Sequence, residues 1–63
     1  MNDLYCVIHD RFYDVFKKEL TNKEYQIIKN TVPTSILEIG KQWGYYDTEF
    51  NQKLYQWISQ LNK

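Results

Sequence analysis

The sequence predicts an all-α fold, a small domain of three to four helices that spans residues 1–63 as a single unit. Three observations support this fold class. Apolar side chains recur every three or four residues over most of the chain, two Ser/Thr-x-x-Glu patterns stand where helices would begin, and Pro33 and Gly44 stand where helices would end. We expect helices over residues 3–18, 22–30, 35–43 and 48–61.

The first helix, residues 3–18, is predicted from the spacing of its apolar side chains. They lie three or four residues apart and so line one side of a helix: Leu4, Ile8, Phe12, Val15 and Phe16. A short strand over residues 4–8 is the alternative, because a brief apolar run fits either structure. The continuation of the pattern through Phe16 favours the helix.

The second helix, residues 22–30, has a clear start and a clear stop. Thr21 and Glu24 form a capping box, in which each side chain accepts a hydrogen bond from the other residue's backbone amide. Leu20 before the box and Tyr25 after it match a hydrophobic staple, and Ile27 and Ile28 continue the apolar pattern. Pro33 then disfavours helical conformation at the preceding residue and ends the run.

The third and fourth helices, residues 35–43 and 48–61, meet at a turn. Ser35 and Glu38 repeat the capping-box pattern, so we expect the third helix to begin within a residue of Ser35. Gly44 is suited to the positive φ that often follows a helix, and Asp47 is suited to cap the fourth helix. We assign to the core the large apolar side chains on these two helices: Trp43, Phe50, Leu54, Trp57, Ile58 and Leu61.

Composition excludes several classes of function. The chain has eight basic and eight acidic residues, one cysteine and one histidine, which leaves no disulfide and too few ligands for a zinc site. Cys6 and His9, with Asp10, provide neither a metal site nor a catalytic nucleophile with its base and oxyanion donors. We therefore expect no enzyme activity, no cofactor and no metal. The absence of a leader and of a long apolar span indicates a cytoplasmic protein without membrane contact.

Residues 35–54 resemble the helix-turn-helix motif of the phage Cro/repressor and MerR-type families. That motif has a small residue in the middle of its first helix, a glycine four residues later, and apolar residues six and ten positions after that glycine. Gly40, Gly44, Phe50 and Leu54 occupy these places. The resemblance implies close approach of the two helices at Gly40, and a helix-turn-helix core over residues 21–63 that follows an N-terminal helix within residues 1–20.

The resemblance also implies a small DNA-binding protein, either a transcriptional regulator or an accessory factor of a bacterial, phage or other mobile-element system. The second helix of the motif would then enter the major groove of double-stranded DNA. Its outward face carries Tyr46, Asp47, Thr48, Asn51, Gln52 and Tyr55. Asn51 and Gln52 have the paired donor and acceptor that suit adenine, and Lys41 and Lys53 would contact phosphates.

The charge of this stretch favours a second hypothesis, in which the same fold binds protein. Asp47 and Glu49 open the second helix of the motif, where they would repel phosphate, and the net charge of zero supplies no basic surface. The chain would then be a non-enzymatic adaptor, inhibitor or accessory subunit of a larger protein such as a polymerase or nuclease. Tyr45, Tyr46 and Tyr55 would make the contact, because tyrosine is common at binding hot spots.

The N-terminal helix exceeds what a three-helix core needs. It can pack on that core as a fourth helix, or it can pair with a copy of itself in a homodimer that would supply a second DNA half-site. Packing within the monomer is the simpler arrangement, and it is the one we expect.

Overall fold

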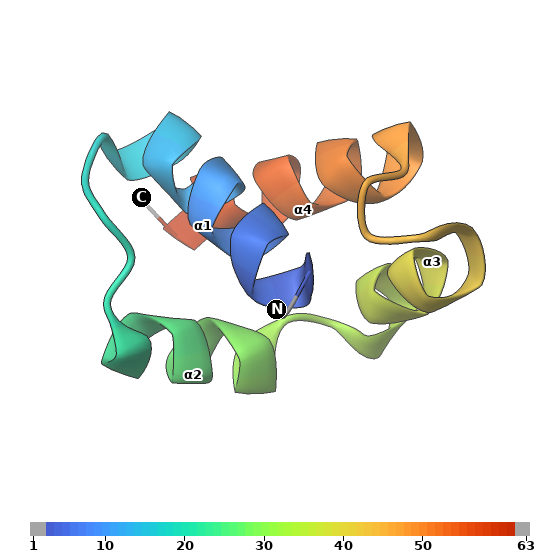
Figure 1. Ribbon diagram of the computed structural model, residues 1–63, viewed down its shortest axis with the longest axis horizontal. Coiled ribbons are helices and arrows are strands. Elements are labelled where there is room, and N and C mark those ends of the chain that lie inside the picture. The colour runs from blue at the N-terminus through green and yellow to red at the C-terminus, as the bar shows by residue number, and fades with distance from the viewer. Residues whose placement is uncertain (1–2, 62–63) are drawn as a thin grey trace.

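The computed structural model describes residues 3–61, and over that range its regular elements are all helices (Figure 1). Its helices are α1 (Asp3–Phe16), α2 (Asn22–Thr31), α3 (Thr34–Trp43) and α4 (Thr48–Leu61). The predicted fold class and all four predicted helices are confirmed. The strand alternative for residues 4–8 is wrong, because these residues lie within α1.

Helix α1 ends two residues earlier than predicted. Lys17 has a φ of 60°, a left-handed conformation that a helix cannot continue, although its amide still donates to the carbonyl of Tyr13 at 2.9 Å. A residue other than glycine in this conformation costs roughly 1–2 kcal/mol. The chain then crosses to Leu20, which is buried in the core and fixes the start of the next helix.

The capping box of α2 forms as predicted. The amide of Glu24 donates to Thr21 Oγ1 at 3.2 Å, and the amide of Thr21 donates to Glu24 Oε1 at 3.1 Å. This second hydrogen bond is the main cause of a lowered pKa of the Glu24 carboxyl, so the box is formed by the charged carboxylate. The helix extends one residue beyond the predicted end, to Thr31, and Val32 before Pro33 is non-helical.

The second predicted capping box is wrong. Helix α3 begins at Thr34, within a residue of the predicted start, but its cap is Pro33 and no side chain makes a capping hydrogen bond. The Pro33 carbonyl accepts from the amides of Ile36 and Leu37, at 3.0 and 3.2 Å. Because Ser35 is already inside the helix, it lacks the extended conformation that a capping side chain requires.

The turn between α3 and α4 follows the sequence prediction closely. Gly44 ends α3 with φ 103° and ψ 150°. The φ is positive as predicted, but the ψ lies outside the left-handed helical region, in a conformation essentially restricted to glycine. Asp47 then caps α4, since its Oδ2 accepts from the amide of Phe50 at 3.2 Å.

The core lies around one stripe of α4. Phe50, Leu54 and Ile58 are each at most 1% exposed. Helix α1 packs on α4 most extensively, α3 packs on the other part of it, and α2 packs on α1 (Figure 1). The remaining buried apolar side chains come from the other helices and the connections between them: Val7, Ile8, Phe12, Leu20, Tyr25, Ile28, Val32 and Ile36.

Two side chains assigned to the core from the sequence are on the surface. Trp43 is 66% exposed and Leu61 is 46% exposed, whereas Trp57 is partly buried against the core. Trp43 is the last residue of α3, where no further turn of helix continues the buried stripe, and Leu61 is the last residue of α4 that the structure describes. Ile27 is also exposed, because it lies about 100° around α2 from its buried neighbour Ile28.

Gly40 lies where α3 comes close to the segment that follows it. A β-carbon built there would lie 2.6 Å from Cδ1 of the Tyr45 ring and 2.9 Å from Cε1 of Phe50. The Phe50 ring is fully buried and has little room to move. The predicted need for a small residue at this position is therefore confirmed.

We expect Gly40→Ala to lower the free energy of unfolding by about 1–2 kcal/mol, because the overpacking outweighs the better helix propensity of alanine. Urea denaturation followed by circular dichroism measures this. Lys41→Ala, at an exposed position of the same helix, is the control and should change stability by less than about 0.5 kcal/mol. A Gly40→Ala variant as stable as the wild type would contradict the packing described.

Candidate functional site

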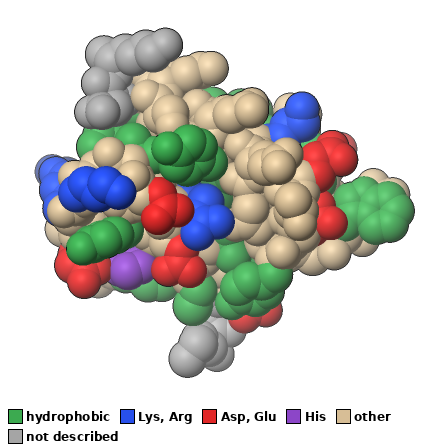
Figure 2. Space-filling view, turned by 90° about the horizontal axis from the view of Figure 1, so that it is seen from above, with side chains coloured by type: hydrophobic (Ala, Val, Ile, Leu, Met, Phe, Trp, Pro, Cys, Tyr) green, Lys and Arg blue, Asp and Glu red, His purple; other side chains and the backbone are tan. Residues whose placement is uncertain are grey.

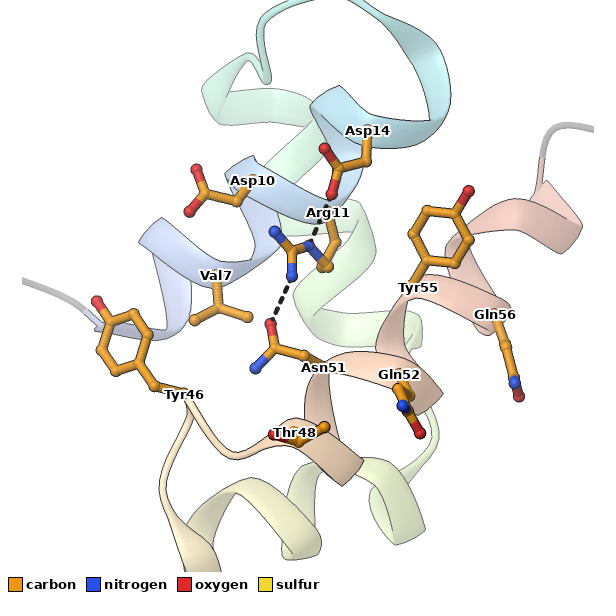
Figure 3. Close-up of a pocket in the computed structure, with 10 residues that line it drawn as sticks. All are labelled: Val7, Asp10, Arg11, Asp14, Tyr46, Thr48, Asn51, Gln52, Tyr55 and Gln56. Atoms are coloured by element: carbon orange, nitrogen blue, oxygen red, sulfur yellow. Dashed lines mark hydrogen bonds and ion pairs between the residues drawn. The ribbon is translucent and has the colours of Figure 1, made fainter.

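Most of the residues proposed from the sequence to contact DNA lie together in one groove between α1 and α4. The groove has a volume of about 840 Å³. Figure 3 shows its lining, with one wall from α1 and the other from α4 and the turn before it. The α4 side consists of Tyr46, Thr48, Asn51, Gln52, Tyr55 and Gln56, and the α1 side consists of Val7, Asp10, Arg11 and Asp14.

Three of the residues proposed from the sequence lie outside this groove. Lys41 and Lys53 are exposed on α3 and α4 but do not line it. Tyr45 is partly buried, and its ring packs on that of Phe50 with centroids 5.5 Å apart. Tyr45 therefore supports the turn, while Tyr46 and Tyr55 remain at the surface.

The side-chain amide of Asn51 is fully used within the fold. Its Nδ2 donates to the carbonyls of Tyr45 and Asp47, at 3.0 and 2.8 Å, and so closes the turn onto α4. Its Oδ1 accepts from Nη1 of Arg11 at 3.1 Å. Reading the edge of an adenine would require these hydrogen bonds to break, since the amide has no donor left for a base.

Arg11 joins the two walls of the groove. Besides its bond to Asn51, its Nε lies 3.1 Å from Oδ2 of Asp14, three residues along the same helix. The Nε atom is buried and makes no hydrogen bond of good geometry, so Asp14 acts on it as an ion-pair partner. The only arginine of the chain is thus occupied in holding α1 against α4.

Two exposed tyrosines stand at opposite ends of the groove. Tyr46 is 65% exposed and Tyr55 is 42% exposed, and Figure 3 shows them on either side of Asn51. Partial desolvation of its hydroxyl, together with the nearby side chains of Asp3, Cys6 and Asp10, raises the pKa of Tyr46. The Tyr46 hydroxyl therefore stays protonated at neutral pH and can donate a hydrogen bond.

The electrostatics of the groove do not match a phosphate backbone. Two carboxylates and one guanidinium line it, which gives a formal charge of −1. Figure 2 shows the face formed by α1 and α4, where acidic and basic side chains are interspersed beside a broad area without charge. A groove of this kind repels phosphate and attracts cationic or neutral polar groups.

A separate polar contact lies on α1 beside the 17–21 connection. His9 Nε2 hydrogen-bonds the carboxylate of Glu19, and His9 Nδ1 lies 3.5 Å from Oδ1 of Asp10. The bond to Glu19 is the main cause of a raised pKa of His9, with a smaller contribution from Asp10. Protonation of His9 therefore strengthens the contact between α1 and Glu19 of the 17–21 segment.

Metal sites, membrane-spanning helices and similarity to known proteins are three further features that bear on the function of the chain. Within residues 3–61 no group of three or more His, Cys, Asp or Glu side chains is placed to hold a metal ion. None of the helices α1 to α4 is both long and apolar enough to cross a membrane. No known family model, curated protein or solved structure matches this chain.

Sequence reasoning found the α4 wall of the groove but missed the α1 wall. Val7, Arg11 and Asp14 are spaced four and three residues apart, so they share one face of the helix. That spacing was a usable signal. Its meaning depends on which helix packs against that face, and no local pattern specifies this.

We expect Asn51→Ala to lower the free energy of unfolding by about 1–3 kcal/mol, because Nη1 of Arg11 and two turn carbonyls lose their hydrogen bonds to Asn51. Gln52→Ala, at the exposed neighbouring position, is the matched control and should stay within about 0.5 kcal/mol of the wild type. Urea denaturation of the three proteins tests this. Equal stability of all three would show that Asn51 is not part of the fold.

The raised pKa of His9 predicts a pH-dependent stability. The contribution of the protonated histidine is fully present below its unfolded pKa of about 6.5 and is lost as the pH rises through the higher folded value. Because Glu19 is largely exposed, we expect protonated His9 to contribute less than about 1 kcal/mol to the free energy of unfolding. Wild-type stability relative to His9→Gln should fall as the pH rises above about 6.5, as measured by urea titration, and parallel pH profiles would refute this.

Proposed function

We propose that this protein is a small non-enzymatic binding module, an adaptor, inhibitor or accessory subunit that docks on a larger protein through the groove between α1 and α4. The observation that carries this proposal is the arrangement of the groove itself. Two exposed tyrosines lie at the ends of a mixed polar and apolar groove, in which Arg11 and Asn51 are already hydrogen-bonded to each other. Rigid aromatic anchors beside a preorganised polar surface are typical of protein-binding sites.

The size of the module agrees with this role. Interfaces of standard size bury about 800 Å² on each partner. The groove and its two tyrosines provide the centre of such a surface. Trp43, at the end of α3 and 66% exposed, is a further exposed aromatic side chain, but it does not line the groove.

DNA binding is the second candidate function, and one observation favours it. Thr48 and Gln52 are exposed at the start of α4, which follows α3 after a short turn and, as Figure 1 shows, crosses it steeply. Lys41 and Lys53 are exposed on the same two helices. The opposite wall of the groove argues against DNA binding. It carries Asp10 and Asp14, and these carboxylates would be brought close to the phosphates and repelled by them.

Capture of partners from the native host tests the proposal. We expect the tagged protein to retain a partner that is lost when Tyr46 and Tyr55 are both changed to alanine, because hot-spot tyrosines contribute about 2 kcal/mol or more each. Tyr13→Ala is the matched control, since Tyr13 is 47% exposed on α1 but lies outside the groove. Circular dichroism confirms that each variant is folded.

The outcome against the proposal is equally specific. Capture of the same proteins by the double variant would show that the groove is not the docking site. A second titration distinguishes the DNA candidate, using fluorescent duplexes of random sequence at roughly 50 mM salt, where electrostatic attraction is least screened. Binding that weakens steeply with salt and is lost in Thr48→Ala and Gln52→Ala would favour DNA over protein.

A further inference from the structure

The groove has an uncompensated negative charge at one end. Arg11 is paired with Asp14 and bonded to Asn51, so the charge left over on the lining belongs to Asp10. Asp10 is 61% exposed, and its one described ion-pair contact is with His9 at 3.5 Å, which is an ion pair only while His9 is protonated. The shorter contact of His9 is with Glu19, and Asp10 is mostly exposed, so the Asp10 carboxylate stays accessible to a group that enters the groove even while His9 is protonated.

An exposed aromatic ring lies at the same end of the groove, on the opposite wall. Figure 3 shows Tyr46 and Asp10 at the same end of the groove, with Val7 between them at the base. The Tyr46 hydroxyl lies near the Asp3, Cys6 and Asp10 side chains of α1, so two carboxylates stand close to this end of the groove. A carboxylate and an exposed tyrosine face are the two groups that together hold a cationic side chain, through an ion pair and a cation–π contact.

Other classes of ligand fit the Asp10 and Tyr46 end of the groove less well. A phosphate or an acidic peptide meets like charge from Asp10, and an apolar helix would desolvate that carboxylate without giving it a partner. Further along, the amides of Gln52 and Gln56 and the hydroxyl of Thr48 line the α4 wall. These groups can bond the backbone of an extended peptide on either side of a basic residue.

We infer that the groove takes a basic segment of the partner protein and that an arginine or lysine side chain of that segment lies between Asp10 and Tyr46. The inference rests on the proposed function and specifies the chemistry of its partner. Arginine suits the site better than lysine, because its planar guanidinium can pair with the carboxylate and stack on the ring at the same time.

The test uses a fluorescein-labelled nonapeptide of alternating arginine and leucine, titrated against the full chain and followed by anisotropy at roughly 50 mM salt. The same peptide with citrulline in place of arginine keeps the shape and removes the charge. We expect the arginine peptide to bind and the citrulline peptide to bind at least about fivefold more weakly. Asp10→Asn should weaken the arginine peptide by about fivefold, the usual size of one partly exposed ion pair.

Two variants make the result specific. Glu38→Gln removes the same charge from an exposed position on α3 and should leave the affinity within about twofold of the wild type. Tyr46→Ala should weaken binding as Asp10→Asn does. Equal affinity for the citrulline peptide, no effect of Asp10→Asn, an equal effect of Glu38→Gln, or no binding of the arginine peptide up to about 1 mM would each overturn the inference.

These failures are distinguishable from a failure of the proposed function. If the tyrosine variants lose a captured partner while the peptide results go against a cationic site, the groove binds protein by other chemistry. If capture is unchanged in the tyrosine variants and the peptides do not bind, both proposals are wrong.

Discussion

The burial of a single stripe of α4 determines the rest of this structure. Phe50, Leu54 and Ile58 exclude water almost completely, and the other buried apolar side chains form a single cluster with them. Helix α3 can approach this stripe because Gly40 leaves room for the rings of Tyr45 and Phe50. Helix α1 covers the other part, so it is integral to the core.

The position of α1 changes the meaning of the exposed face of α4. From the sequence, that face is a polar surface suited to the major groove of DNA. In the structure Arg11 reaches across from α1 to the Asn51 amide, and Asp10 and Asp14 stand opposite Thr48 and Gln52. The same residues therefore form a walled groove with an acidic end, and this arrangement is the basis for proposing a protein partner with a basic segment.

Local features were predictable because their causes are local. The capping box at Thr21, the positive φ at Gly44 and the cap at Asp47 depend on residues within a few positions of each other, and all three are present. The box at Ser35 failed because Pro33 starts the helix earlier. The exposure of Trp43 and the contact between Arg11 and Asn51, 40 residues apart, depend on how the helices pack, which periodicity does not specify.

The hydrogen bonds of the Asn51 side chain are the central feature to test, because the groove depends on them. They hold the turn to α4, and through Arg11 they hold α1 to the turn and to α4. Nuclear magnetic resonance of the ¹⁵N-labelled protein can follow the two side-chain amide protons of Asn51. Hydrogen bonds to the carbonyls of Tyr45 and Asp47 predict that they exchange with solvent much more slowly than those of exposed Gln52, and that they lie close enough to Arg11 for a nuclear Overhauser effect. If the Asn51 amide protons exchange as fast as those of Gln52 and show no nuclear Overhauser effect to Arg11, these hydrogen bonds are absent and the structure of the groove is wrong.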